Sequence, residues 1–242
     1  MRTQEKRATR FRSIQTSLLF VIVPAVIISM AVLSLMGYLS SKAIIQTSAG
    51  NEMSQCLSVA MGSIEMSLSN NRMVAETMAR GVEAVQRQAV KGEQTASDWD
   101  AAAYQEILTS FVESNPETFG GGIWFEPYQY RPEQRYFSPY CMRQNGAVTY
   151  VDNYSLGEGV YYTDQDWYTN AANTTQKSVW SAPYYDEFAQ ISMVTSSAPI
   201  YDETGRLLGV ATADIDLTQM QQMVLSLDVV ANGRAFLIDD TG

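Results

Sequence analysis

The stretch ISMVTSSAPIYDETGRLLGVATADIDL, residues 191–217, decides the fold of the larger part of this chain. Two mainly apolar segments, residues 191–201 and 207–214, flank the sequence Asp202-Glu203-Thr204-Gly205, whose composition is typical of a tight turn. Apolar, β-branched runs bounded by turn residues favour strands. We therefore predict two long strands joined by a hairpin, followed by an amphipathic helix over residues 217–227.

Upstream of this hairpin the sequence predicts further short strands. Three glycines, residues 120–122, open the strand-like segment IWFE. Residues 134–142 and 147–151 are predicted to pair about Asn145-Gly146, a dipeptide that favours a two-residue hairpin turn. The remaining predicted elements are a loop over residues 152–166, a short helix near residues 167–172 and a strand over residues 178–181. Helices and strands mixed in this order predict an α+β fold.

Two helices are predicted before the first strand. Residues 97–115 have Ser97 as a candidate N-cap and Asp100 at the capping-box position. From residue 40 to about residue 90 there is no proline, and apolar residues recur at alternating four- and three-residue steps. That stripe consists of Leu57, Met61, Ile64, Leu68, Ala75, Met78, Val82 and Val85, and it is broken only by Asn71. We predict one long helix over residues 40–96 that packs partly on its own domain and partly against a second subunit.

Residues 18–39, LLFVIVPAVIISMAVLSLMGYL, form a run of 22 residues without a charge. As a helix the run is roughly 33 Å long, enough to cross the hydrocarbon core of a bilayer. The basic residues that precede it favour a cytoplasmic segment over residues 1–17, which places the chain after residue 39 outside the cytoplasm. A cleaved signal peptide is the alternative, although its apolar core is usually about 7–15 residues long. We predict an uncleaved transmembrane anchor in the cell membrane.

The chain beyond residue 39 is strongly acidic. It holds 11 of the 16 basic and 25 of the 26 acidic residues, a net charge of −14 against −10 for the whole chain. A field of this sign repels nucleic acid and concentrates cations, which excludes nucleic-acid binding. The chain contains no histidine, so Ser-His-Asp and Cys-His catalysis and the commonest metal ligand are excluded. We predict no enzymatic activity, no cofactor and no metal site.

The end of the sequence repeats the turn of the long hairpin. Residues 200–205, IYDETG, are similar to residues 237–242, LIDDTG. A return strand follows the first copy but not the second, and an unpaired hairpin strand leaves backbone groups without partners. We expect residues 228–242 to begin a second, truncated module of a longer chain that includes a second membrane crossing.

The segments DQDWYTNA (residues 164–171) and SVWSAPYYDE (residues 178–187), together with residues 191–217, closely resemble the extracytoplasmic double Cache sensor domain of bacterial chemoreceptors, sensor kinases and cyclases. The resemblance covers roughly residue 40 to the end. It implies a long membrane-emergent helix and two stacked PAS-like modules with antiparallel sheets, the distal one over residues 97–227. It further implies ligand binding in the distal module and a homodimer.

The resemblance also implies a set of ligand-binding residues. Trp167 and Tyr168 match the family's aromatic pair, Tyr184 and Asp186 match its Tyr-x-Asp, and Asp214 matches the acid of its last strand. The two carboxylates are expected to accept hydrogen bonds from a ligand ammonium. The Trp-Tyr pair is expected to close the wall of the pocket.

Two positions depart from the family's amino-acid-binding pattern. An arginine is expected two positions before the Trp-Tyr pair, where this chain has Gln165 between Asp164 and Asp166, and the upstream tyrosine position holds Val160, next to Tyr161. A guanidinium grips a carboxylate with two charge-assisted hydrogen bonds, which a glutamine does not provide. We include Tyr161, Asp164 and Gln165 among the candidate ligand-binding residues.

The surrounding composition favours a cationic ligand. Between Gln144 and Gly205, Lys177 is the single basic residue among acidic and aromatic side chains. Aromatic faces beside carboxylates suit an ammonium, with cation–π contacts that contribute roughly 0.5–2 kcal/mol. A cationic amine therefore fits better than a zwitterionic amino acid, which is the alternative. An alternative interpretation also stays open, in which the tryptophans belong to the hydrophobic core and the acids are solvent-exposed loop residues.

Three functions remain open at this point. The favoured one is a transmembrane receptor with a small enclosed pocket for an extracellular solute, most simply a methyl-accepting chemotaxis receptor, with a histidine kinase or diguanylate cyclase input domain as the alternative. A surface-anchored carbohydrate-active enzyme would show two carboxyls about 5–9 Å apart across an open groove. A passive adhesion module would lack a pocket lined by Trp167, Tyr184 and Asp214.

Overall fold

The computed structural model describes residues 14–89, 101–151, 154 and 159–225. The chain divides into two compact units, Met1–Cys56 and Leu57–Gly242. The predicted cap at Ser97, residues 1–13 of the predicted cytoplasmic segment and the predicted start of a second module over residues 228–242 lie outside the described residues.

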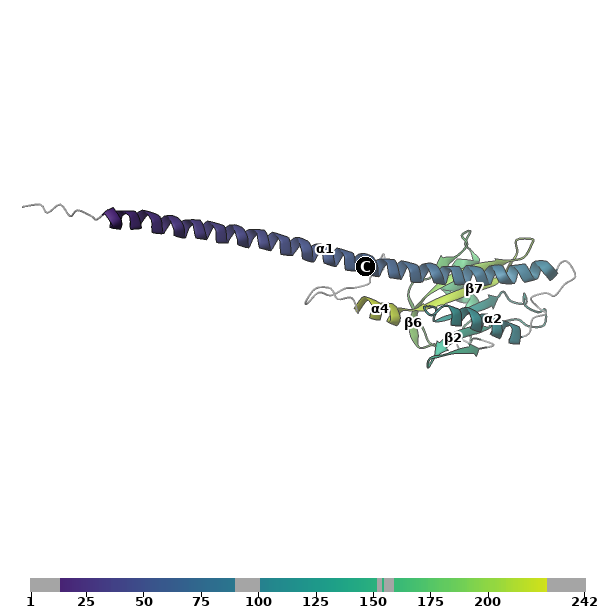
Figure 1. The fold of residues 1–242 in the computed structure, drawn as a ribbon. Helices are drawn as coiled ribbons and strands as arrows, with labels where there is room; N and C mark the ends of the chain where they lie inside the picture. Colours follow the sequence, from purple (N-terminus) through teal and green to yellow (C-terminus); the bar gives the residue numbers. More distant parts are fainter. Residues whose placement is uncertain (1–13, 90–100, 152–153, 155–158, 226–242) are drawn as a thin grey trace, which may run out of the picture. The chain divides into compact units, whose positions relative to one another are not determined.

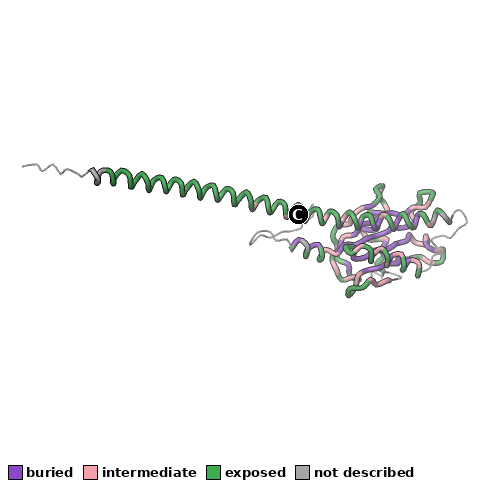
Figure 2. Tube along the Cα trace, viewed as in Figure 1, coloured by how far each residue is buried: buried purple, intermediate pink, exposed green. Residues whose placement is uncertain are grey.

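A single helix, α1 (Ile14–Ala89), accounts for the described residues of the first unit and continues into the second. It runs through Pro24 without a break, as the uninterrupted apolar pattern predicts. Among the described residues it is the one helix long and apolar enough to cross a membrane, and the most apolar window, with a mean hydropathy of 2.8, has no buried residue. The exposed turns of residues 18–55 are drawn in green in Figure 2.

The second unit is built on an antiparallel sheet (Figure 1). Its strands run in the order β3-β2-β1-β7-β6-β4, and β5 pairs with β6 beside β4. Their bounds are β1 (Gly120–Phe125), β2 (Tyr140–Gln144), β3 (Ala147–Val151), β4 (Val179–Trp180), β5 (Tyr184–Asp186), β6 (Ile191–Tyr201) and β7 (Leu207–Asp216). The long β6–β7 hairpin predicted from the sequence is confirmed, and it occupies the middle of the sheet together with β1.

Side chains of adjacent residues in β1 point to opposite faces, because successive residues of a strand alternate. Ile123 and Phe125 join a core with Val74–Val82 of α1 and with α2 (Ala101–Ser114). Trp124 joins an aromatic core on the other face, with α3 (Asp166–Ala172). The 3₁₀ turn η2 (Tyr162–Asp164) precedes α3, and α4 (Leu217–Leu225) follows β7.

The apolar stripe of the long helix divides in two. Asn71, Ala75, Met78 and Val82 are buried against the sheet, whereas Leu57 is 37% and Met61 is 60% exposed. The later turns of α1 therefore pack on their own module, as the stripe predicts (Figure 2).

One local prediction is wrong, and one strand is missed. The strand predicted over residues 134–142 begins only at Tyr140, because Arg131 to Gln134 form a tight turn with an isolated bridge between them. The sequence analysis does not predict the strand β5, since three residues are too few to show an alternating pattern. The hairpin turn at Asn145-Gly146 is confirmed, with φ angles of 53° and 82°.

Candidate functional site

A small cavity lies inside the aromatic face of the sheet, between β1, β2, β5, β6, β7 and α3. Its volume is about 10 Å³, room for about one water molecule. It is lined by Trp124, Tyr140, Tyr154, Trp167, Tyr184, Asp186, Met193, Thr195, Thr212 and Asp214. The lining residues include two carboxylates and no basic side chain.

Asp214 is positioned by β7 in the middle of the sheet. Its Oδ2 accepts a hydrogen bond from the Tyr140 hydroxyl at 2.7 Å, and its Oδ1 accepts one from Thr195 Oγ1 at 2.7 Å. Because the Thr195 proton points to Asp214, the Tyr184 hydroxyl, 2.7 Å from Thr195 Oγ1, donates to the threonine. The strand pairing places Thr195 directly opposite Asp214.

Burial raises the pKa of the Asp214 carboxyl to about 7. The hydrogen bonds from Tyr140 and Thr195 lower this pKa, and the negative charge of Asp186 raises it further. Burial also raises the pKa of Tyr140 and of Tyr184 above the ordinary value, so both hydroxyls keep their protons and act as donors. Asp214 is therefore a carboxyl close to its titration midpoint at neutral pH.

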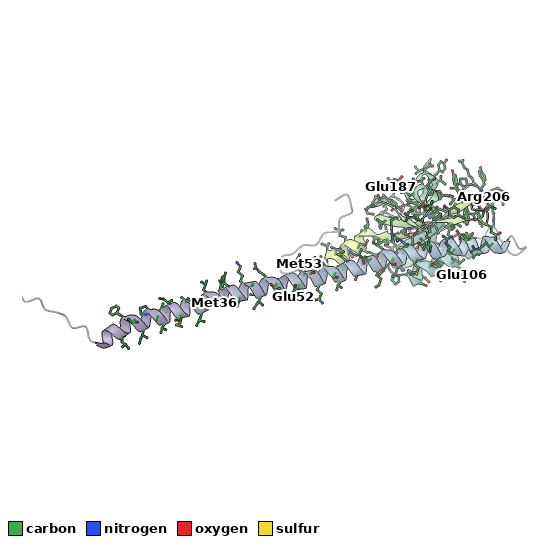
Figure 3. All side chains as sticks on the ribbon, turned by 90° about the horizontal axis from the view of Figure 1, so that it is seen from above. Met36, Glu52, Met53, Glu106, Glu187 and Arg206 are labelled. Atoms are coloured by element: carbon green, nitrogen blue, oxygen red, sulfur yellow. The ribbon has the colours of Figure 1, made fainter. Side chains whose placement is uncertain are left out.

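Asp186 supplies the second carboxylate from the end of β5, and it is 5% exposed. Its Oδ1 accepts hydrogen bonds from the Tyr154 hydroxyl at 2.5 Å and from the Ala189 backbone N–H at 2.7 Å. The Ala189 contact closes the turn between β5 and β6. Figure 3 labels Glu187 in this turn and Arg206 in the β6–β7 turn, at separate places on the module.

Aromatic rings form the remaining walls. The Trp124 ring lies 4.8 Å from Trp167 and 5.2 Å from Tyr154, centroid to centroid, and Tyr140 lies 4.9 Å from Tyr154. The Trp124 indole N–H donates to Thr212 Oγ1 at 2.7 Å, which fixes the orientation of the ring. The partly exposed ring of Phe188 covers Tyr154 at 4.5 Å.

The structure brings four of the predicted site residues together at the cavity, namely Trp167, Tyr184, Asp186 and Asp214. The other four lie elsewhere. Tyr168 donates its hydroxyl to Glu126 at 2.8 Å, away from the cavity. Tyr161 is 39% exposed and stacks on Tyr136 at 5.0 Å. Asp164 is exposed, and the Gln165 amide reaches back to the Tyr161 carbonyl at 3.4 Å.

Sequence reasoning did not select Trp124, Tyr140, Tyr154, Met193, Thr195 or Thr212. Thr195 and Thr212 could have been found, because the hairpin register places them beside Asp214 on the same face. Tyr140 comes from β2, two strands away from β7, and no local pattern indicates that contact. Among the described residues there is no group of three or more His, Cys, Asp or Glu that could hold a metal ion.

Comparisons with known proteins relate this module to sensor domains. Residues 104–222 match the model of the family described as "Methyl-accepting chemotaxis protein-like, first PDC sensor domain". Methyl-accepting chemotaxis protein McpC of Bacillus subtilis (strain 168) is 39% identical over 80 residues, which are 33% of this chain and 12% of that protein. McpA of Pseudomonas putida (strain KT2440) is 32% identical over 104 residues, 43% of this chain and 16% of that protein.

A solved structure shares the fold. The ligand-binding domain of the Campylobacter jejuni chemoreceptor Tlp3 in complex with L-valine superposes with a TM-score of 0.56 at 15% identity, and the match covers 77% of this chain and 66% of that one. Residues 104–222 therefore form a PAS-like sensor domain of the PDC, or Cache, type. The chain spans less than a fifth of the curated relatives that it matches.

Proposed function

We propose that this chain is the sensory part of a transmembrane receptor and that it detects a small cationic amine at the Asp186–Asp214 cavity. The observation that carries the proposal is the pair of buried carboxylates without a basic partner among the lining residues. An unpaired buried charge is costly unless a partner compensates it. A ligand ammonium between the two carboxylates supplies that partner.

Hydrogen-bond counting favours a primary amine. A carboxylate offers about four lone-pair positions, and a primary ammonium has three N–H donors. Asp214 accepts one bond on each oxygen, and among the described residues none donates to Oδ2 of Asp186. Two lone-pair positions on Asp214 and two on Oδ2 of Asp186 therefore stay free, enough for all three donors. A quaternary ammonium has no N–H group and would leave these positions without a donor.

A ligand larger than a water molecule must displace side chains to enter. Tyr154 lines the cavity, and its ring contacts Phe188, which is 40% exposed and follows Asp186 by two residues. The turn over residues 186–190 has Gln190 at a φ of 59°, so it ends in a conformation that few residues adopt. Movement of this turn opens the cavity, and closure over the ligand selects the bound state.

An amino acid is the second candidate, because the Campylobacter neighbour holds L-valine. Such a ligand carries a carboxylate, which needs a cationic or N–H partner. None of the residues that line the cavity is basic, and Gln165 lies outside it and bonds to Tyr161. Charge balance thus favours an amine over a zwitterion.

The test is calorimetric titration of the detergent-solubilised chain with ethylamine, L-alanine and tetramethylammonium. We expect binding of ethylamine alone, and a loss of about 10–100-fold in affinity in Asp186→Asn and in Asp214→Asn, since a charge-assisted hydrogen bond contributes about 1.5–3 kcal/mol. Asp164→Asn is the matched control, because this carboxylate is exposed. Tighter binding of L-alanine than of ethylamine would refute the amine assignment.

The receptor architecture belongs to the same proposal. α1 anchors the chain through residues 18–39, with the N-terminus in the cytoplasm and the sensor module outside, and a second copy of the chain packs on α1. The output is that of a methyl-accepting chemotaxis receptor, supported by the names of both curated relatives. A kinase or cyclase output is the alternative, and the domain that follows in the gene distinguishes them.

A further inference from the structure

Asn71 is a polar side chain in the apolar face that α1 packs on the sheet. It is fully buried, and its neighbours along the face are Val74, Ala75 and Met78. Its Oδ1 accepts a hydrogen bond from Thr118 Oγ1 at 2.8 Å, and its Nδ2 donates to the Ser67 carbonyl at 3.1 Å. Both ends of the amide are therefore satisfied inside the interface between helix and sheet.

The partner of Asn71 belongs to the short segment that leads into β1. Thr118 is followed by Phe119, whose backbone N–H donates to the Asp214 carbonyl at 2.8 Å. The next residue, Gly120, pairs directly with Asp214. Two hydrogen bonds and the peptide unit between Thr118 and Phe119 thus connect the helix to the backbone of Asp214 in the cavity.

The same segment is held from the side by Arg143 of β2. Its Nε donates to the Thr118 carbonyl at 3.0 Å, and its backbone N–H donates to the Phe119 carbonyl at 2.8 Å. Thr118 and Phe119 are therefore fixed to two strands and to the helix at once. A shift of β7 that pulls on Phe119 is transmitted to Thr118 instead of being absorbed by a loose loop.

A buried hydrogen bond in an apolar interface fixes the position of the helix along the sheet. Sliding the helix would break the bond between Asn71 and Thr118 and leave two buried polar groups unpaired, which is costly. An apolar contact tolerates small slides, because neighbouring apolar side chains replace one another. Two other polar contacts involve acids of α1. Glu76 accepts a hydrogen bond from the hydroxyl of Ser178, the residue before β4, and Glu83 accepts one from the Tyr201 N–H at the end of β6, away from Asp214.

We propose that Asn71 is the positioning residue that couples the ligand cavity to helix α1 through Thr118. Ligand contact at Asp214 shifts β7 and the start of β1, and the bond between Thr118 and Asn71 carries that shift to the helix. This rests on the proposed function in one respect only, that the ligand acts at Asp214.

Hydrogen exchange with mass spectrometry tests the coupling on the whole chain. Saturating ethylamine is expected to slow amide exchange in residues 67–78 of α1 by about fivefold or more. In Asn71→Leu and in Thr118→Val, ethylamine still binds and still slows exchange in β6 and β7, but the slowing in α1 disappears. Asn70→Leu is the matched control, the same change one residue away at an exposed position. This variant is expected to keep the slowing of exchange in α1.

Persistence of the α1 response in Thr118→Val, which removes only the hydroxyl, would overturn the proposal even if Asn71→Leu does not fold. Should ethylamine not bind the wild-type chain, the proposed function fails, and Asp214→Asn serves as the perturbation instead. It is then expected to change α1 exchange in the wild-type background and not in the Thr118→Val background. An equal change in both backgrounds refutes the coupling.

Discussion

Under the proposed function, a proton and a cationic ligand compete for Asp214. Its carboxyl has a pKa of about 7 because burial removes its solvation, whereas an alkylammonium stays charged up to about pH 10. An amine therefore binds the ionised carboxylate and must displace a proton at lower pH. Ethylamine affinity is expected to rise about tenfold per pH unit below pH 7 and to level off above it.

Calorimetry at pH 6 in buffers of different ionisation enthalpy measures this exchange directly. Wild-type protein is expected to release close to one proton per ligand bound, whereas Asp214→Asn releases none. Affinity that is flat between pH 5.5 and 7 would contradict the assignment of Asp214 as the ammonium partner.

The same carboxyl makes stability depend on pH. The folded state holds the proton between the ordinary pKa of 3.8 and about 7, where the unfolded chain has released it. Because the folded state binds more protons, this carboxyl lowers the free energy of unfolding as pH rises from about 4 to 7, by up to about 4 kcal/mol. Urea unfolding at pH 5 and pH 8 should show a smaller decrease in Asp214→Asn than in wild type.

At the scale of elements, β1 depends on the small size of its first glycine. A Cβ on Gly120 would lie 2.1 Å from the Tyr140 hydroxyl oxygen and 2.9 Å from the Cys141 carbonyl oxygen. Gly120→Ala is therefore expected to push Tyr140 off Asp214, to cost about 1–3 kcal/mol of stability and to weaken ethylamine binding at least tenfold. Thermal unfolding and calorimetry measure the two effects.

Gly81→Ala is the control for this change, because a Cβ on Gly81 in α1 meets nothing within 4 Å. Alanine in an exposed helix position is expected to raise stability by up to about 1 kcal/mol and to leave ligand binding unchanged. A Gly120→Ala protein that binds ethylamine like wild type would show that Tyr140 does not matter at the site.

The elements that the sequence predicts well are those with a long, local pattern. β6 and α1 each extend over enough residues for periodicity and flanking turn residues to identify them. β5 has three residues, and it is a strand only because residues 191–193 of β6 lie beside it. Its assignment depends on tertiary pairing, which a single segment does not encode.

The site residues divide in the same way, into those that a local pattern predicts and those that depend on tertiary contacts. Asp186 and Asp214 follow from a family motif, and Thr195 follows from the register of one hairpin. Tyr140 and Trp124 come from β2 and β1, far away in the chain, and their approach depends on strand order. Tyr168 shows the opposite error: it stands beside Trp167 in the motif, but its hydroxyl bonds to Glu126 outside the cavity.

At the scale of the whole molecule, α1 presents an apolar face that its own sheet does not cover. Val59, Met66 and Met73 are 65%, 64% and 60% exposed and recur every seven residues, the spacing of a helix-to-helix contact. We predict that a second copy packs here. Met66→Glu with Met73→Glu is expected to raise the dimer dissociation constant at least tenfold in sedimentation experiments.

Arg72→Glu is the matched control, an exposed charge change between the two methionines in sequence but on another side of the helix. It is expected to leave self-association unchanged. A double variant that sediments like wild type would remove this face of α1 from the interface.

The two carboxylates of the cavity lie on strands that are paired to different extents. Asp214 belongs to a ten-residue strand bonded on both sides, whereas Asp186 ends a three-residue strand that pairs with β6 alone. Grafting a different segment between Ser181 and Ile191 would thus exchange one half of the recognition chemistry and leave the framework intact. Under the proposed function, this segment is a replaceable part through which protein engineers can change the ligand that is detected.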